Sequence, residues 1–207
     1  MFKDRLEAAL MLKDKLKKYS HSNAIVLAVP RGGVPIGYAI AKKLQLPLDI
    51  ILSKKIGHPN NKEFAIGAIA LDSVIIDDQI SVSDSYIHNE TIRLRQLLAE
   101  KYKLYRGNNK PLDINRKNVI LVDDGIATGN TLLASIAMLR KKKPSKIIVA
   151  VPVLPYDTIP IFEQYADELV YILAPHNFRA VGEFYQEFNP VKDEEVIQML
   201  QVTAPNQ

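Results

Sequence analysis

The chain has 207 residues, of which 47% are hydrophobic and 24% are charged, and it contains no cysteine. Such a chain suits one domain of ordinary size, with or without an appended subdomain, and can bury a hydrophobic core. The lack of cysteine excludes disulfides, thiolate metal sites and a cysteine nucleophile. The net charge of +4 is compatible with a polyanionic small molecule and with nucleic acid as a partner.

The first twenty residues carry charges throughout, so they predict neither a signal peptide nor a membrane anchor. No apolar run approaches the ~18 residues that a membrane span needs, and we therefore expect a cytoplasmic protein. Residues 2–19 predict a helix whose buried stripe contains Phe2, Leu6, Leu10 and Leu16, because these residues keep roughly helical spacing.

A buried strand is predicted at residues 24–29, followed by a Pro-Arg-Gly-Gly loop and a helix at residues 34–44. Arg31 in this loop can bind two phosphate oxygens at once, and Gly32 and Gly33 let the backbone approach a ligand closely. A tight turn with a solvated arginine is the structural alternative.

Two lysines, Lys54 and Lys55, follow another short strand that is predicted at residues 48–52. Glycine, proline and asparagine predict that the polar segment at residues 56–63 has no regular structure. Residues 64–76 then predict a hairpin of two strands, although its turn lacks the glycine that a tight turn favours.

A long amphipathic helix is predicted at residues 84–105, and we assign no chemistry to it. The basic residues at 140–143 fall at the end of a later helix, where cations complement the helix dipole. We favour this role of the basic residues at the helix end over a nucleic-acid-binding patch. Strand and helix patterns alternate across residues 24–173, which indicates a parallel sheet with right-handed crossovers.

The segment at residues 118–131 combines an apolar run, two adjacent carboxylates and a loop rich in glycine and threonine. The run predicts a strand buried on both faces, so Asp123 and Asp124 come at its carboxyl end, where open α/β sheets bind ligands. The small loop residues let several N–H groups converge on a phosphate at the start of the next helix. The two acids suit sugar hydroxyls or a divalent cation, and the whole describes a sugar-phosphate site.

The sequence VILVDDGIATGNT resembles the phosphoribosyl pyrophosphate loop of type I phosphoribosyltransferases, and the Pro-Arg-Gly-Gly loop resembles the pyrophosphate loop of the same family. Residues 178–200 resemble the tail of a bacterial and archaeal group of uncharacterised phosphoribosyltransferases. The resemblance implies a Rossmann-like parallel sheet flanked by helices, with a flexible hairpin loop and a small C-terminal hood. It implies a core domain at residues 1–173, which includes the flexible loop at about 54–77, and a hood at residues 174–207.

The resemblance also implies an activity, the transfer of a 5-phosphoribosyl group to a nitrogen acceptor in nucleotide salvage, with release of pyrophosphate. In this family Asp123 and Asp124 would hold the ribose hydroxyls, stabilise the cation-like sugar and orient Mg²⁺, largely through water and substrate. Arg31, together with Lys54 or Lys55, would neutralise the leaving pyrophosphate. The other residues expected to bind the donor are Gly32, Gly33, Gly125, Ile126, Ala127, Thr128, Gly129, Asn130 and Thr131.

The acceptor is expected to be a nucleobase. Ala127 stands where 6-oxopurine enzymes of the family carry an aspartate that handles the purine proton, so the loop is slightly closer to the adenine type. Glu63 is a candidate proton acceptor. Phe178, Phe184 and Tyr185 could stack on a base or could form a small core between hood and sheet.

Two other functions remain open from the sequence. One is a regulator that senses phosphoribosyl pyrophosphate and binds RNA without significant catalysis, and the other is a phosphosugar-binding or hydrolytic protein using the same pocket. The partners that we expect are small molecules, the donor and a base. We expect neither nucleic acid nor membrane, and a homodimer is compatible with this interpretation.

Overall fold

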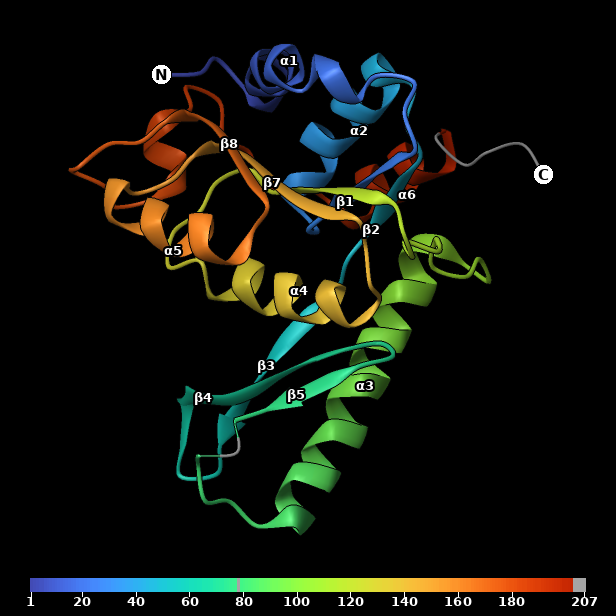
Figure 1. Ribbon diagram of the computed structural model, residues 1–207, viewed down its shortest axis with the longest axis vertical. Coiled ribbons are helices and arrows are strands. Elements are labelled where there is room, and N and C mark those ends of the chain that lie inside the picture. Colours follow the sequence, from blue (N-terminus) through green and yellow to red (C-terminus); the bar gives the residue numbers. More distant parts are fainter. Residues whose placement is uncertain (78, 203–207) are drawn as a thin grey trace.

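The computed structural model describes residues 1–77 and 79–202, apart from the side chains of Glu63 and Val202. Figure 1 shows two lobes: a five-stranded sheet between layers of helices, and a three-stranded sheet that lies along one long helix. No helix in the described ranges is long and apolar enough to cross a membrane. The arrangement confirms the predicted α/β class.

The central sheet consists of five parallel strands in the order β2-β1-β6-β7-β8. Their bounds are β1 (Ala24–Ala28), β2 (Leu48–Ile50), β6 (Asn118–Val122), β7 (Lys146–Val153) and β8 (Glu168–Leu173). β1 and β2 are buried along their whole length, and β6 is buried after its first residue. A strand covered on both faces needs apolar residues at successive positions, which is why continuous apolar runs predict these strands.

Helices cover both faces of the central sheet (Figure 1). One layer contains α1 (Arg5–Lys15), α2 (Gly33–Leu44) and α6 (Asp193–Val202), and the other contains α4 (Asn130–Lys141) and α5 (Ile159–Tyr165). Successive residues of a strand point to opposite faces of the sheet. Val26 and Ile120 therefore join the core beneath α1 and α2, whereas Leu27 and Leu121 join the core beneath α4 and α5.

The predicted buried face of the first helix is partly wrong. Phe2 and Leu16 are buried, but Leu6 is 57% exposed and Leu10 is 37% exposed. The buried face of α1 consists instead of Ala8, Ala9 and Leu12. Small alanine side chains beside Leu12 let α1 lie close to α2 and to the sheet, whereas Leu6 and Leu10 lie on the outer side of the helix. The α-helix ends at Lys15, and a short 3₁₀ helix, η1 (Lys17–Tyr19), follows it.

The smaller sheet is antiparallel and has the order β3-β4-β5, with bounds β3 (Ser53–His58), β4 (Asn61–Ala70) and β5 (Val74–Ile76). The expectation of irregular structure at residues 56–63 is wrong. Ile56 is fully buried and pairs with Gly67, and Gly57 sits at an irregularity of the pairing, where a Cβ atom would overlap the Lys62 backbone. The glycine that suggested a loop thus permits close strand pairing, and Pro59 and Asn60 alone form the connection.

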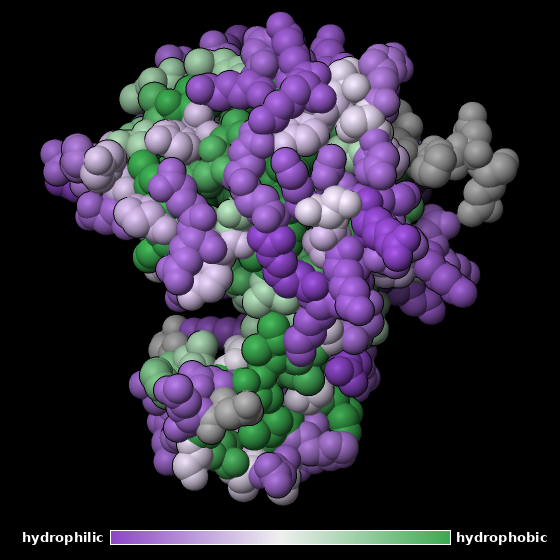
Figure 2. All heavy atoms as spheres, viewed as in Figure 1, coloured by the Kyte–Doolittle hydropathy of each residue, from purple (hydrophilic) through white to green (hydrophobic). Residues whose placement is uncertain are grey.

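The hairpin of β4 and β5 is confirmed, because Ala70 N–H bonds to the Ser73 carbonyl across the turn at 2.9 Å. Its sheet packs on α3 (Asp84–Arg106), as Ile56 and Ile69 lie in one cluster with Leu94 and Leu98. Figure 2 shows hydrophobic side chains concentrated on this lower lobe, whereas hydrophilic side chains cover most of the upper one. A lobe of two layers covers its apolar residues less completely than the central sheet does.

Residues after β8 include the 3₁₀ helix η3 (Val181–Phe184), whereas η2 (Tyr156–Thr158) precedes α5. The segment beside η3 pairs with the first residues of the chain: Phe2 N–H donates to the Phe184 carbonyl at 2.7 Å, and Gln186 N–H donates to the Phe2 carbonyl at 2.8 Å. Farther on, α6 inserts Val196 and Leu200 into the core beneath α2. The C-terminal residues are therefore built into the main lobe at two separate places.

Candidate active site

The two loops singled out from the sequence meet at one edge of the central sheet. Strand order reverses between β1 and β6, because β1 leads to β2 on one side and β6 leads to β7 and β8 on the other. β1 and β6 end side by side, with Ala28 paired to Val122 and Val29 N–H bonded to the Val122 carbonyl at 2.9 Å. Such a switch point is where open α/β sheets bind ligands.

Gly32 and Gly33 lie directly against the acid pair. A Cβ atom on Gly32 would overlap the carboxylate of Asp124, and a Cβ atom on Gly33 would lie 2.6 Å from the Val122 carbonyl oxygen and 2.9 Å from Asp123 Cα. Neither position accepts a side chain unless its neighbours shift. These glycines therefore allow the two loops to touch. The peptide bond between Pro30 and Arg31, just before them, is cis.

The loop after β6 lines a cavity of about 180 Å³. Its lining residues are Asp123, Gly125, Ile126, Ala127, Thr128, Gly129, Thr131, Leu132 and Val181. Gly129 has a left-handed backbone with φ of 77° and caps the start of α4, so glycine is required for this entry into the helix. Asn130 is exposed on the first turn of α4 but does not line this cavity.

Ile126 differs from the other loop residues that were expected to bind the donor. Its side chain is 1% exposed in the core beneath α4, and its N–H bonds to the Val153 carbonyl at 2.9 Å. The residue therefore anchors the loop to the sheet, and its N–H is already used. Around it, Ala127 and Thr128 are exposed, and Thr131 lines the cavity from the first turn of α4.

The two adjacent acids share an unfavourable environment. Burial raises the pKa of Asp123 well above its ordinary value, and the charge of Asp124 raises it further. Burial also raises the pKa of Asp124, although hydrogen bonds from Arg5 oppose this shift. The N–H of Asp124 donates to Asp123 Oδ1 at 2.8 Å. The pair therefore favours a bound cation or hydroxyl donors over two uncompensated negative charges.

Sequence reasoning missed Arg5, which contacts the acid pair from α1. Its Nε and Nη2 atoms lie 3.0 and 2.8 Å from Asp124 Oδ2. Tyr185 was proposed as a base-stacking or core residue, and its hydroxyl donates to the main-chain oxygen of Asp124 at 2.7 Å. Arg5 is 119 residues from Asp124 in the chain and resembles the other charges of α1, so no local pattern marks it.

Arg31 precedes the two glycines that touch the acid pair, and its side chain points toward Asp193 at the start of α6. Its side chain is 50% exposed, and Nη1 lies 3.6 Å from Asp193 Oδ1. Asp193 also accepts hydrogen bonds from Lys101 at 2.8 Å and from the Tyr105 hydroxyl at 2.6 Å. This acid therefore connects the loop after β1 to α3 and α6.

We expect Asp193→Asn to lower the melting temperature by a few degrees at pH 7. The hydrogen bond from Lys101, and then that from Tyr105, lowers the pKa of Asp193 below its ordinary value. A lowered carboxyl pKa stabilises the fold above the unfolded pKa of about 3.9, and this stabilisation is lost as pH falls through the folded pKa. Thermal melts between pH 3 and pH 8 should show the difference narrowing below about pH 4.

Asp157→Asn is the matched control, because Asp157 is exposed at η2 and carries the same charge. It should leave the melting temperature unchanged at every pH. Equal melting of wild type and Asp193→Asn at pH 7, or a difference as large at pH 3 as at pH 7, would contradict this account of Asp193.

Lys54 and Lys55 belong to the first half of β3, and both are exposed. The start of β3 lies beside α4, because Ser53 Oγ is 3.1 Å from Ser135 Oγ. Neither lysine lines the 180 Å³ cavity of the loop after β6. Their predicted part in neutralising pyrophosphate stays a prediction.

The aromatic residues of the tail form a small cluster. Tyr185 is 5% exposed and packs against Phe2 and Phe188, with ring centroids 5.2 and 4.9 Å away. Phe178 stacks on Phe184 at 5.4 Å, and both join this cluster. The arrangement supports the core alternative for these residues, most firmly for the buried Tyr185. The side chain of Glu63, the candidate proton acceptor, lies outside the described residues.

Val181 of η3 was not identified from the sequence, although it forms one wall of the cavity. A Cβ atom on Gly125 would lie 2.6 Å from Val181 Cγ1. Val181, which belongs to the C-terminal segment, thus packs against Gly125, the first residue after the two acids. Glycine at this position leaves the space that Val181 fills.

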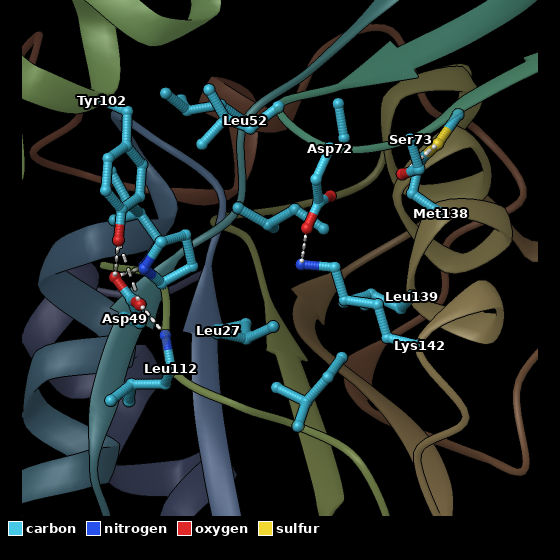
Figure 3. A pocket seen from close by; sticks show the side chains of 16 residues that line it. Leu27, Asp49, Leu52, Asp72, Ser73, Tyr102, Leu112, Met138, Leu139 and Lys142 are labelled. Carbon is cyan, nitrogen blue, oxygen red and sulfur yellow. Dashed lines mark hydrogen bonds and ion pairs between the residues drawn. The ribbon is translucent and has the colours of Figure 1, made fainter.

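A second cavity, of about 40 Å³, lies between the central sheet and α3 and contains none of the predicted site residues (Figure 3). Its buried carboxylate is Asp49, which is 1% exposed and accepts from Leu112 N–H at 2.9 Å and from the Tyr102 hydroxyl at 3.3 Å. Arg106 Nε lies 3.2 Å from the same carboxylate. The cavity has room for water but not for a nucleobase, and its charges already have partners.

Among the described residues, no group of three or more histidines or acids could hold a metal ion. Asp123 and Asp124 therefore have no third acid or histidine beside them, within the described residues, to complete a metal site. Magnesium commonly binds through one or two carboxylates together with substrate phosphates.

Residues 5–184 match the family described as the phosphoribosyl transferase domain, and the chain belongs to this family. A Mycobacterium tuberculosis H37Rv protein, named provisionally as a phosphoribosyl transferase, is 36% identical over 209 residues, which cover 97% of this chain and 46% of that protein. The chain therefore spans about half the length of this relative. The resemblance stated from the sequence is confirmed.

Solved structures support the fold. The crystal structure of TT1426 from Thermus thermophilus is 32% identical, with a TM-score of 0.91 over 99% of this chain and 100% of that one. A purine phosphoribosyltransferase from Pyrococcus horikoshii aligns with a TM-score of 0.50 and 18% identity, over 91% of this chain and 93% of that one. The second likeness shows the fold alone.

Proposed function

We propose that the chain catalyses transfer of a 5-phosphoribosyl group from phosphoribosyl pyrophosphate to a ring nitrogen of a nucleobase, with release of pyrophosphate. The observation that carries this proposal is the meeting of the acid pair, the 180 Å³ cavity and the Pro-Arg-Gly-Gly loop at one switch point of the sheet. Membership of the family supports it. A role in nucleotide salvage and a cytoplasmic location stay predictions from the sequence.

The loop after β6 would hold the ribose 5-phosphate. Ala127, Thr128 and Thr131 lie around the cavity, and the positive end of the α4 dipole lies beside them. Backbone N–H groups at a helix start bind phosphate without any charged side chain. This explains how a loop whose nearest charges are two acids can bind an anion.

Asp123 and Asp124 would face the sugar. Breaking the bond to pyrophosphate leaves positive charge on the ribose, and partly buried carboxylates stabilise such charge more than exposed ones because less water competes with them. Burial raises the pKa of both acids, and the charge of Asp124 raises the pKa of Asp123 further, so a cationic sugar or hydroxyl donors would stabilise carboxylates whose charge is otherwise disfavoured. The two carboxylates would also hold Mg²⁺, largely through water. The ion would neutralise charge on the pyrophosphate as it leaves.

The leaving pyrophosphate would bind at the loop after β1. Arg31 is half exposed, and its 3.6 Å approach to Asp193 is loose, so its guanidinium can turn to a phosphate. Lys54 or Lys55 would supply further positive charge from the start of β3. The hairpin that follows would close over the donor and exclude water, which protects an activated sugar from hydrolysis.

The acceptor base would be bound close to the same cavity. Ala127 has no group that can accept a proton, so a base that needs a protein carboxylate at this position is disfavoured. We therefore favour adenine slightly over 6-oxopurines. The residue that takes the proton would come from outside the loop after β6.

Incubation of the protein with Mg²⁺, donor and one nucleobase at a time, followed by assay of pyrophosphate, tests the proposal. One base should accelerate pyrophosphate release well above the rate with donor alone, and a matching nucleotide should accumulate. Equal slow release with every base would contradict the transferase and favour a hydrolase. Donor binding without any release would favour a donor-sensing regulator.

A further inference from the structure

Arg5 is held on three sides beside the acid pair. Its Nε and Nη2 donate to Asp124 Oδ2 at 3.0 and 2.8 Å, and Nη1 donates to the Asn189 carbonyl at 2.8 Å. The guanidinium also lies over the ring of Phe188, 4.0 Å from its centroid. Its side chain is only 12% exposed, so this arginine is fixed in place, unlike a mobile surface cation.

Asp124 is fixed from a second direction as well. The Tyr185 hydroxyl donates to its main-chain oxygen at 2.7 Å, and Tyr185 itself lies against Phe2 in a short parallel bridge. Residues 2–5 and 184–189 thus form one brace that holds both the side chain and the backbone of Asp124. The side chain of Asp123, by contrast, receives the N–H of Asp124.

We propose that Arg5 is a positioning residue for Asp124 in the donor site. The Nε and Nη2 atoms of Arg5 donate to the same carboxylate oxygen, Oδ2, which leaves Oδ1 to accept a hydrogen bond from a ribose hydroxyl. Its charge also offsets the repulsion between two adjacent carboxylates. The proposal rests on the proposed function, because it requires Asp124 to bind the sugar of the donor.

If Arg5 positions Asp124, loss of Arg5 should change the affinities for two ligands to different extents. Inorganic phosphate uses only the loop after β6, whereas ribose 5-phosphate uses that loop and also the hydroxyl acceptors of the acid pair. In the full chain, Arg5→Gln should weaken ribose 5-phosphate by at least about tenfold, which corresponds to one well-aligned charged hydrogen bond. Its affinity for inorganic phosphate should change by less than about threefold. Isothermal titration calorimetry measures both affinities.

Two further variants sharpen the comparison. Lys13→Gln removes a cation from the same helix, where it pairs at 2.6 Å with Asp14 on the surface, and should change neither affinity. Arg5→Lys keeps the charge but offers a single point of contact, so it should recover only part of the affinity for ribose 5-phosphate. If Arg5→Gln does not fold, as judged by thermal melting, Arg5→Lys is measured with the same two ligands, and wild-type affinity of Arg5→Lys for ribose 5-phosphate would overturn the inference.

The outcomes separate this inference from the function on which it rests. Wild type that binds neither ribose 5-phosphate nor donor would overturn the proposed function and the inference together. Wild-type binding with no selective loss in Arg5→Gln would overturn the inference alone, since Arg5 would then only join α1 to the tail. Tighter binding of ribose 5-phosphate by Arg5→Gln would also overturn it, because Arg5 would then block the site.

Discussion

Asp124→Asn is expected to lower kcat/KM for phosphoribosyl transfer by at least about a hundredfold, the usual effect of removing one fixed electrostatic group from a buried site. The carboxylate lies at the switch point, against Gly32, and is held by Arg5. Asparagine keeps the shape and an oxygen for Arg5, but it removes the charge that would stabilise a cation-like ribose. Pyrophosphate release with the active base measures the effect.

The fold should survive this change. Burial raises the pKa of Asp124, so the charged form is disfavoured in the folded chain, and a neutral side chain costs little there. We expect a melting temperature within a few degrees of wild type. Asp14→Asn, which removes an exposed acid from α1, is the control and should leave turnover unchanged. Turnover that is unchanged in Asp124→Asn would refute the assignment of this carboxylate.

Asp49→Ala is expected to lower the free energy of unfolding by about 3–5 kcal/mol, because it leaves a buried arginine without its counter-ion. The side chains of Asp49 and Arg106 are 1% and 5% exposed, so the pair is shielded from bulk water. Tyr102 and the N–H of Leu112 would lose their acceptor as well. For a chain of this size the melting temperature should fall by roughly 10 °C.

A second variant compares the loss of stability in Asp49→Ala with the loss caused by breaking an exposed ion pair. Asp72→Ala breaks a pair with Lys142 whose atoms are 2.7 Å apart but whose side chains are 54% and 34% exposed, and should cost less than about 1 kcal/mol. Combining Asp49→Leu with Arg106→Leu should recover much of the stability that Asp49→Ala loses, since neither charge of the pair then remains. Equal destabilisation by Asp49→Ala and Asp72→Ala would contradict the account.

The central sheet and the two loops at its edge could be predicted because their signals are local. α3 begins at its predicted residue and extends one residue beyond its predicted end. Parallel strands covered on both faces require unbroken apolar runs, and a phosphate loop requires small residues just after its strand. Asp123 and Asp124 could be placed at the switch point for the same reason.

Other features could not be predicted because they depend on contacts between distant parts of the chain. Arg5 differs from its neighbours only through Asp124, Phe188 and Asn189, which come much later in the sequence. The buried face of α1 was misassigned, because hydrophobicity alone does not reveal that alanines lie where helices approach closely. Gly57 was interpreted as a breaker, yet the backbone of a facing strand explains it.

The contact between Gly32 and Asp124 constrains how the site can be altered. Neither the loop at residues 30–33 nor that at residues 123–131 has its shape independently, because each fills space that the other leaves. If only one of these loops were replaced by that of a relative, its shape would not fit the other loop, which would be unchanged. Exchange of the donor site between family members therefore requires both loops to be replaced together.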